Sequence, residues 1–261
     1  MVGGSSGRMR GRVWDVDPQV KGVAHEYIDS VFRQLLQGIS RRLPSQCAVC
    51  HTWPAQPVCE ACVAAFAQPV HRCSTCARTV PAGVDRCGAC LVKPPPLDAC
   101  LAAVSYAYPW STLVVDFKFH EHPGWAASFA QLLRATPWVE PALDAADMVI
   151  PMPMSAQRLR ERGYNQAQVL ARALDAPKLA PDVLLRVQDT PPQRTLPRSE
   201  RLRSVQHAFA VEPLRAAQLR ERRVVLVDDV MTSGASLHAA ALALRQAGVT
   251  HITGLVLART E

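Results

Sequence analysis

Two adjacent carboxylates, Asp228 and Asp229, follow an apolar run and stand directly before a loop of small and hydroxyl residues. Residues 224–227 are Val-Val-Leu-Val, which is typical of a buried strand. Residues 237–244 have the composition of a helix. A strand that brings acids to its carboxyl edge and then turns into a helix N-terminus is suited to holding a sugar phosphate.

The individual residues of this run fit that chemistry. The two carboxylates can accept hydrogen bonds from ribose hydroxyls, and each such charge-assisted bond is worth about 1.5–3 kcal/mol. The hydroxyls of Thr232, Ser233 and Ser236 and the neighbouring backbone N–H groups can surround a phosphate. Gly234 allows the backbone to approach it closely.

Two other interpretations compete for the same run. An apolar strand that ends in two acids also resembles the metal-binding strand of P-loop nucleotide hydrolases. That class requires a G-x-x-x-x-G-K-[ST] loop, and this chain has no Gly-Lys pair. The other interpretation is a core strand that ends in solvated acids, which the hydroxyl-rich loop and the following helix disfavour.

At every position from 224 to 236 the run resembles the phosphoribosyl pyrophosphate (PRPP) motif of type I phosphoribosyltransferases. The resemblance implies that the acids bind the 2′- and 3′-hydroxyls of the ribose and that residues 232–236 bind the 5′-phosphate. It also implies a magnesium-dependent reaction, in which Mg²⁺ accompanies the PRPP. The expected PRPP-binding residues are Asp228, Asp229, Val230, Met231, Thr232, Ser233, Gly234, Ala235 and Ser236.

Eight of the nine cysteines form four C-x-x-C pairs. Two such pairs complete a tetrahedral Cys₄ site, so four pairs predict two structural zinc ions. Cross-brace pairing and an iron–sulfur cluster are the alternatives. We expect consecutive pairing, with one ion at Cys47, Cys50, Cys59 and Cys62 and the other at Cys73, Cys76, Cys87 and Cys90. His51 and His71 are expected to be bystanders, and the unpaired Cys100 to be a small buried hydrophobe.

Composition narrows the class of protein further. A net charge of +7 suggests an anionic partner, which phosphates, nucleic acid or merely a basic solvated surface would explain. No apolar run approaches the roughly 18 residues of a membrane span, and the glycine-rich N-terminus lacks the apolar core of a signal peptide. We therefore expect a cytoplasmic protein without membrane contact, in which cysteines stay reduced.

The elements that must position these residues divide the chain into four parts. We expect a disordered N-terminus over 1–24, an amphipathic helix over 25–43 and a double zinc ribbon over 44–93. The Lys-Pro-Pro-Pro linker at 93–96 predicts a domain boundary. Residues 97–261 alternate strands and helices, which predicts an α/β domain with a largely parallel sheet. The expected strands cover 102–108, 148–153, 224–227 and 251–258, and the expected helices cover 111–119, 126–133 and 165–174.

A second anion-binding segment follows the strand near residue 150. Three arginines within five residues, Arg158, Arg160 and Arg162, stand beside the turn and could grip a pyrophosphate. A solvated basic helix face would also explain them. The place of this segment after a strand favours anion binding, because ligands of open α/β sheets lie at the carboxyl ends of the strands.

The segment 190–203 is proline-rich, basic and nearly free of large apolar groups. A long loop of this kind in a compact domain is a linker or a lid. As a lid it would carry Gln193, Arg198 and Arg203 over bound PRPP and exclude water. The expected catalytic residues are Asp228, Asp229 and Arg198.

The combination of zinc ribbon and PRPP motif resembles the ComF/GntX family of competence-type phosphoribosyltransferases. The matching pieces are the four cysteine pairs, the 93–96 linker, Lys118-Phe119, Pro151-x-Pro153, residues 158–166, the Gln193…Arg198…Arg201 loop, Ala208-Phe209 and the PRPP motif. Where the family has asparagines before Ala-Phe, this chain has Ser204 and His207. The expected pyrophosphate-binding residues are Pro151, Met152, Pro153, Arg158, Arg162 and Lys118.

The resemblance also implies single-stranded DNA and helicase-type competence proteins as partners. Because nothing in the chain identifies the acceptor, two functions stay open. The first is a phosphoribosyltransferase. The second is a PRPP-sensing or catalytically idle protein that binds single-stranded nucleic acid, for which the few aromatics of the ribbon, Trp53 and Phe66, offer limited stacking surface.

Overall fold

The computed structural model describes residues 45–119, 122–187 and 208–261. The expected N-terminal segment and amphipathic helix, and the expected lid with Gln193, Arg198 and Arg203, lie outside the described residues. Residues Gln46–Glu261 form one compact unit. Within the described part of the chain, no helix is both long enough and apolar enough to cross a membrane.

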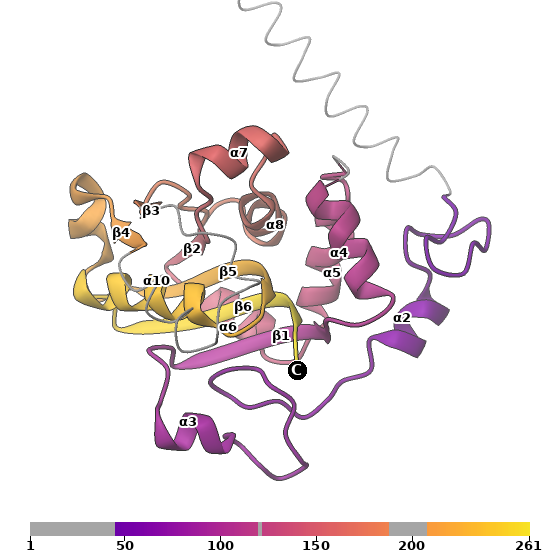
Figure 1. Cartoon of the computed structure of the whole chain (residues 1–261), viewed down its shortest axis with the longest axis horizontal. Helices are drawn as coiled ribbons and strands as arrows, with labels where there is room; N and C mark the ends of the chain where they lie inside the picture. Colours follow the sequence, from indigo (N-terminus) through magenta and orange to yellow (C-terminus); the bar gives the residue numbers. More distant parts are fainter. Residues whose placement is uncertain (1–44, 120–121, 188–207) are drawn as a thin grey trace, which may run out of the picture. The chain divides into compact units, whose positions relative to one another are not determined.

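Four parallel strands form the central sheet, in the order β1-β6-β5-β2 (Figure 1). They are β1 (Ala99–Ser105), β2 (Met148–Pro151), β5 (Arg223–Met231) and β6 (His251–Arg259). The two central strands, β5 and β6, are rich in Val, Leu and Ile because both of their faces are covered. This arrangement confirms the expected α/β fold with a mostly parallel sheet.

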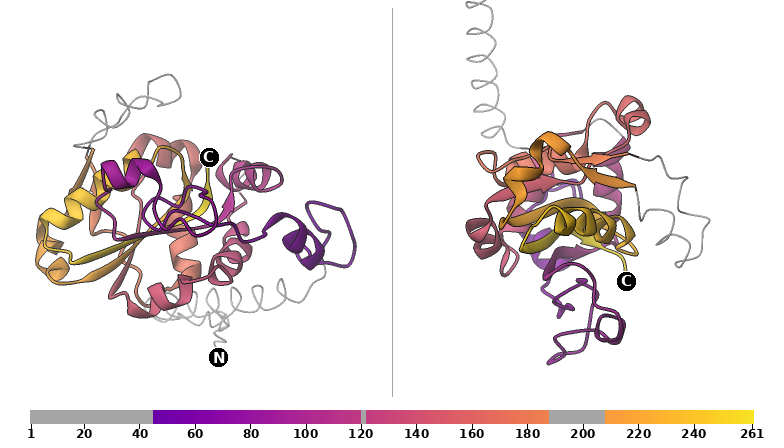
Figure 2. Two further views of the ribbon diagram at one scale, coloured as in Figure 1. Left: turned by 90° about the horizontal axis from the view of Figure 1, so that it is seen from below. Right: turned by 90° about the vertical axis from the view of Figure 1, so that its left-hand side faces the viewer.

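The two faces of the sheet pack against different elements. Val225, Val227 and Leu255 face helices α4 (Trp110–Phe119), α5 (Trp125–Arg134), α6 (Val139–Ala145) and α8 (Gln166–Leu174). Val224, Leu226 and Ile252 pack in a second core with α10 (Ala235–Gln246) and with the short strands β3 (Leu184–Arg186) and β4 (Phe209–Val211). Successive side chains of a strand point to opposite faces, which explains this alternation. Figure 2 shows the sheet from two further directions.

Short elements complete the domain. Strands β3 and β4 pair antiparallel as a separate two-stranded sheet, and they flank the expected lid. Helix α7 (Ala156–Arg162) follows β2, and the 3₁₀ helix η2 (Pro213–Leu219) precedes β5. Strand β1 begins three residues earlier than the expected 102–108. It ends at Ser105 because residues 106–109 form the turn that leads into α4.

The cysteine-containing segment carries two short helices, α2 (Glu60–Phe66) and α3 (Gly88–Val92). It does not stand apart from the sheet. Cys73, Cys76 and Cys90 belong to the same buried core as Leu226 and Met231. The prolines at 94–96 therefore mark a local stiff connection within one compact unit, and the domain boundary expected there does not separate two bodies.

Candidate functional site

Strand β5 continues through both acids to Met231, four residues beyond its expected last residue. The long neighbour β6 explains the extension, because Asp228 pairs with Val256 and Met231 pairs with Arg259. The loop between β5 and α10 is therefore only Thr232-Ser233-Gly234, and the acids lie near the carboxyl edge of the sheet.

Gly234 makes the tight entry into α10 possible. Its φ angle is +82°, a left-handed conformation that L side chains rarely adopt. A Cβ atom there would lie 2.5 Å from the Met231 side chain and 2.9 Å from Nε2 of His238. The Gly234 carbonyl accepts the first helical bond from the N–H of His238 at 2.8 Å, so α10 directs its N-terminal N–H groups toward the loop.

The two acids differ in their surroundings. Asp229 is 7% exposed and forms an ion pair with Lys118, whose Nζ lies 3.0 Å from Oδ1. Asp228 accepts a hydrogen bond from the N–H of Asp229 at 2.9 Å. Desolvation of the Asp228 carboxyl group, followed by the negative charge of Asp229, raises the pKa of Asp228 to about 7.

Lys118 is held in place by the turn between α7 and α8. The hydroxyl of Tyr164 donates to the carbonyl of Phe117, and the side-chain amide of Gln166 donates to the carbonyl of Lys118 at 3.3 Å. Gly163, with a φ angle of +76°, ends α7 and allows this turn. The 163–166 segment thus ties the C-terminal end of α4 to the site, a role that the sequence analysis did not assign.

The end of β2 lies beside the strand that carries the acids. The N–H of Met152 donates to the carbonyl of Val227 at 2.8 Å. The side-chain amide of Asn165 donates to the carbonyl of Met152 at 3.0 Å, and Asn165 also caps α8. The expected pyrophosphate segment Pro151-Met152-Pro153 is therefore next to the acids.

The two predicted arginines of α7 are placed differently. The Arg162 guanidinium lies over the ring of Phe119, 4.7 Å from its centroid, and donates to Gln166 at 3.2 Å. It also interacts electrostatically with Asp229. Arg158 is partly exposed near the N-terminus of α7, which Ser155 caps. Arg162 is thus already held beside Asp229 by its neighbours, whereas Arg158 stands nearer to solvent.

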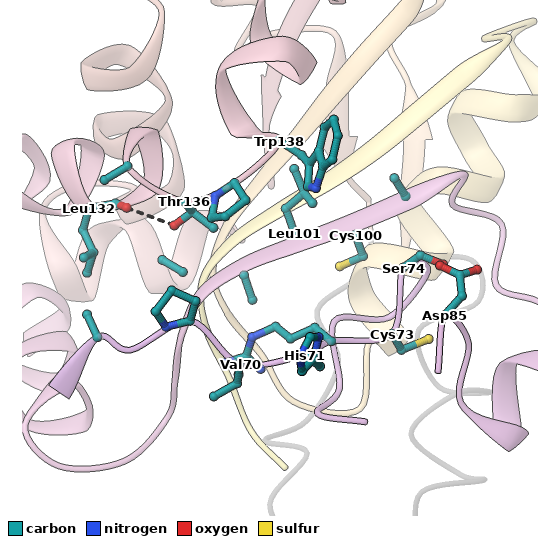
Figure 3. A pocket seen from close by; sticks show the side chains of 18 of the residues that line it. Val70, His71, Cys73, Ser74, Asp85, Cys100, Leu101, Leu132, Thr136 and Trp138 are labelled. Carbon is teal, nitrogen blue, oxygen red and sulfur yellow. Dashed lines mark hydrogen bonds between the residues drawn. The ribbon is translucent and has the colours of Figure 1, made fainter. Parts of the chain in front are cut away.

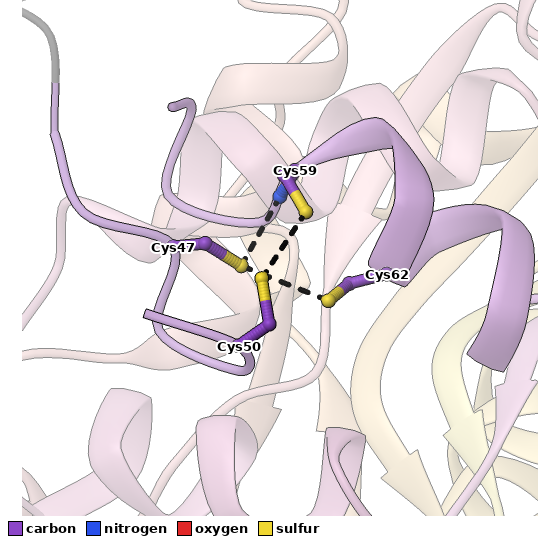
Figure 4. A group of neighbouring side chains, drawn as sticks. All are labelled: Cys47, Cys50, Cys59 and Cys62. Carbon is purple, nitrogen blue, oxygen red and sulfur yellow. Dashed lines mark hydrogen bonds between the residues drawn. The ribbon is translucent and has the colours of Figure 1, made fainter. Parts of the chain in front are cut away.

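The cysteines form two groups, as the spacing predicted. Their sulfur atoms lie within 4.8 Å of one another in each group, and this grouping excludes cross-brace pairing. The Sγ atoms of Cys50 and Cys59 are 3.6 Å apart (Figure 4). Four thiolates around zinc, with Zn–S bonds of about 2.3 Å, would be separated by about 3.8 Å. The first group is Cys47, Cys50, Cys59 and Cys62, and the second group is Cys73, Cys76, Cys87 and Cys90.

Each group contains the same backbone interaction with a sulfur. The N–H of Cys59 donates to Sγ of Cys47 at 3.4 Å, and the N–H of Cys87 donates to Sγ of Cys73 at 3.3 Å. Burial alone would raise the pKa of Cys47 and Cys73, but such hydrogen bonds lower each pKa to about 6. One thiolate stabilised in this way in each group, together with an all-sulfur donor set, suits structural zinc.

A model of the phosphoribosyl transferase domain matches residues 159–260. Competence protein F of Haemophilus influenzae is 34% identical over 196 residues, which are 72% of this chain and 84% of that protein. The chain belongs to the ComF family. DNA utilization protein YhgH of Salmonella typhi is 31% identical over 217 residues, covering 78% of this chain and 90% of that protein. Competence protein ComFC of Bacillus subtilis is 35% identical over 101 residues, 39% of each chain.

Residues 224–236 of this ComF protein, which resemble the PRPP motif, lie inside the segment that matches the transferase domain. Residues 159–260 include β5, the 232–234 loop and α10, together with the Tyr164–Gln166 turn. Lys118 and both cysteine groups lie before the matched segment. The candidate site thus combines residues of the matched segment with Lys118, which precedes that segment in the chain.

A cavity of about 700 Å³ lies between β1, the segment that joins α5 to α6 and the second cysteine group (Figure 3). It is bounded by Leu101 of β1, by Trp138 and by Cys73, Ser74 and Asp85 of the second ribbon. None of the residues expected to bind PRPP or pyrophosphate lines it. The candidate site is therefore the open edge at the β5 loop, and not this cavity.

Sequence reasoning missed two groups of residues that organise the site. Tyr164 and Gln166 were recognised only as part of a family pattern, although a glycine followed by three hydrogen-bonding side chains is a signal for a structured turn. Arg259 was missed because it follows an apolar strand, where an arginine ordinarily reaches solvent. In the structure it is buried.

Proposed function

We propose that this ComF-family protein binds PRPP together with Mg²⁺ and transfers the phosphoribosyl group to an acceptor. The observation that carries the proposal is the β5–α10 junction. It combines two acids at a sheet edge, a three-residue loop, a left-handed glycine and a helix N-terminus. This junction lies within the segment that matches the phosphoribosyl transferase domain.

In this proposal PRPP is the phosphoribosyl donor, and different residues bind its different parts. Asp228 and Asp229 accept hydrogen bonds from the ribose hydroxyls, and the Thr232–Ser236 segment holds the 5′-phosphate. Lys118, Arg158 and Arg162 bind the pyrophosphate at the end of β2. Bound Mg²⁺ would supply further positive charge on the pyrophosphate oxygens. The acceptor forms a bond to C1 of the ribose as the bond from C1 to the pyrophosphate oxygen breaks, and pyrophosphate leaves with the bonding electrons.

The ion pair between Lys118 and Asp229 has a defined place in this scheme. In the absence of donor, each group satisfies the charge of the other across 3.0 Å. When PRPP is bound, Asp229 accepts hydrogen bonds from the ribose hydroxyls and Lys118 pairs with the pyrophosphate. Because the turn at 163–166 holds the backbone of α4, the lysine can exchange partners without moving its helix.

The biological setting that we propose is the use of DNA taken up by the cell. Two relatives are named competence protein F and DNA utilization protein YhgH. A net charge of +7 supports an anionic partner such as single-stranded DNA. We extend the proposal to a cytoplasmic location and to competence helicase-type proteins as partners on the same basis.

Calorimetry with Mg-PRPP tests donor binding. The wild-type protein should bind, and the Asp228→Ala/Asp229→Ala double variant should lose at least about 100-fold in affinity, because two charge-assisted sets of hydrogen bonds disappear. Asp182→Ala is a matched control, since Asp182 pairs with Arg215 on the surface at 2.7 Å. Zinc content, measured by atomic emission, should be unchanged in both variants. No binding to the wild type would overturn the proposal.

Turnover separates transfer from sensing. Pyrophosphate release should be followed with nucleobases, amines and single-stranded DNA as acceptors. Release that depends on one acceptor supports transfer and identifies the acceptor class. Binding of PRPP without release across the panel would support the alternative, a PRPP-sensing protein that binds nucleic acid.

A further inference from the structure

Arg259, the last residue of β6, is 2% exposed and is among the largest fully buried side chains in the described part of the chain. A buried guanidinium must donate to fixed acceptors, because leaving it unpaired is costly. Its acceptors therefore show which parts of the molecule it holds together.

Its acceptors come from two separate regions. The Nε–H group donates to the carbonyl of Cys76 at 2.9 Å, within the second cysteine group. The Nη1 group donates to the carbonyl of Met231 at 3.1 Å and to that of Thr232 at 2.5 Å. Thr232 is the first residue of the 232–234 loop, which we call the donor loop because the proposed function assigns PRPP to it. Nη1 also donates to the Thr260 carbonyl. One side chain thus connects a metal-ligand knuckle to the loop expected to hold the 5′-phosphate.

Other contacts reinforce the same connection. The Cys100 N–H donates to the carbonyl of Ser74 at 2.7 Å, and the Cys100 sulfur lies 3.6 Å from that of Met231. Arg72 donates to the carbonyl of Ala77 at 3.0 Å and to the Ser105 hydroxyl at 3.0 Å. The Cys73–Arg78 knuckle is therefore fixed against β1 and β6, whose C-terminal ends lie side by side (Figure 1).

We propose that Arg259 is a positioning residue that couples the metal occupancy of the second cysteine group to the geometry of the donor loop. An ion bound by Cys73, Cys76, Cys87 and Cys90 fixes the Cys76 carbonyl, and that carbonyl orients the guanidinium beneath Met231 and Thr232. Loss of the ion releases the knuckle, so the loop loses one of its supports. The part of this inference that concerns PRPP rests on the proposed function, whereas the part that concerns the loop does not.

Coupling of this kind is reciprocal. If metal in the second group favours the loop conformation that binds donor, then bound donor must retain the metal more tightly. Removal of zinc by a chromogenic chelator should show two phases, one for each group. Mg-PRPP should slow the phase of the second group and leave that of the first group unchanged.

Hydrogen–deuterium exchange of the zinc-loaded full chain tests the loop directly, without PRPP. In Arg259→Lys, which keeps the charge but lacks the planar fork, exchange at residues 230–236 should rise by about tenfold. Arg259→Met should show a larger rise if it folds. Arg245→Lys is the matched control, because Arg245 also donates to two carbonyls, those of Val249 and Thr250, at the opposite end of α10.

The outcomes distinguish this inference from the proposed function. Unchanged exchange at 230–236 in Arg259→Lys, or an equal rise in Arg245→Lys, overturns the inference even if the wild type binds PRPP. A selective rise at 230–236 supports it even if PRPP does not bind, in which case only the proposed function fails. If PRPP binds, Arg259→Lys should weaken binding by about tenfold at full zinc content.

Discussion

The two cysteine groups have the same ligands and the same N–H···S bond, but they are embedded differently. In the first group, Cys50 is exposed and Cys59 is half-buried. The group joins the core that contains α4, and the Trp110 side chain donates to the carbonyl of Phe66 at 2.8 Å nearby. In the second group, three of the four cysteines are buried in the core of the donor strand.

The difference shows that one metal-binding motif can serve two structural purposes. The first group organises its own ribbon and rests on a helix. In the second group, the side chains of Arg72 and Arg259 donate to backbone carbonyls of Ala77 and Cys76. Its buried cysteines pack in the same core as Met231. Three buried cysteines tie the second group into one core of the sheet, whereas the first group has two buried cysteines in the core on the α4 face. We therefore expect the first group to unfold more locally than the second.

Removing one ligand from each group is the strongest test of this contrast. Cys76→Ser should destabilise the domain by about 5 kcal/mol or more, because loss of this zinc also disturbs the buried core that Cys76 shares with Leu226 and Met231. For a domain of this size the melting temperature should fall by at least about 10 °C. Cys59→Ser should lower it by less than about 3 °C, since the sheet keeps its own contacts.

Differential scanning calorimetry with zinc quantification measures both variants. Each should lose one equivalent of zinc, which serves as the internal control. Equal changes in melting temperature would contradict the distinction between the two groups.

The pH dependence of unfolding separates the donor strand from both metal groups. A carboxyl group whose pKa is raised to about 7 on folding holds its proton more tightly in the folded state. Its contribution to stability is therefore present at pH 4 and is lost as the pH rises through 7. Asp228→Asn lacks this dependence, so it should exceed the wild type in stability by about 1–3 kcal/mol at pH 8 and by much less at pH 5.

Denaturant titrations of both proteins at pH 5, 6, 7 and 8 measure this difference. Zinc content should stay constant over the range. A stability difference that does not change with pH would show that the Asp228 carboxyl group is ionised throughout.

A smaller effect concerns the link between the first group and α4. Trp110→Phe removes the indole donor to Phe66 and keeps an aromatic side chain, so it should cost about 1 kcal/mol. The chelator phase of the first group should become faster and that of the second group should not. Acceleration of both phases would indicate that the two groups share one cooperative unit.

Local patterns in the sequence were sufficient for the fold class, the four strands of the central sheet and the grouping of the cysteines. They did not predict the short elements α6, α7, β3, β4 and η2. The apolar run before Asp228 predicted a buried strand, and short C-x-x-C intervals favoured consecutive pairing. They were insufficient where partners are distant in sequence. Strand β5 extends through its acids because β6 pairs with it, and no local property of Asp228 or Asp229 reveals that partner.

The same limit explains the other differences. The three prolines after Lys93 predicted a stiff linker and a domain boundary. The second cysteine group nevertheless packs against the sheet, through hydrogen bonds made by Cys100 and Arg259 that lie outside that local pattern. Tyr164 and Gln166 act on carbonyls of α4 that lie more than forty positions away. The roles proposed for the donor-site residues stay predictions until binding is measured.

The position of Arg259 in the chain also has a consequence for synthesis. It follows Cys76 by 183 residues, so a ribosome completes the second cysteine group long before it adds the arginine that supports it. The nascent chain can load metal early, but the knuckle acquires its buried guanidinium only when β6 joins the sheet. Final consolidation of this metal group must therefore follow translation of the last strand, and chains truncated before β6 should release zinc from it readily.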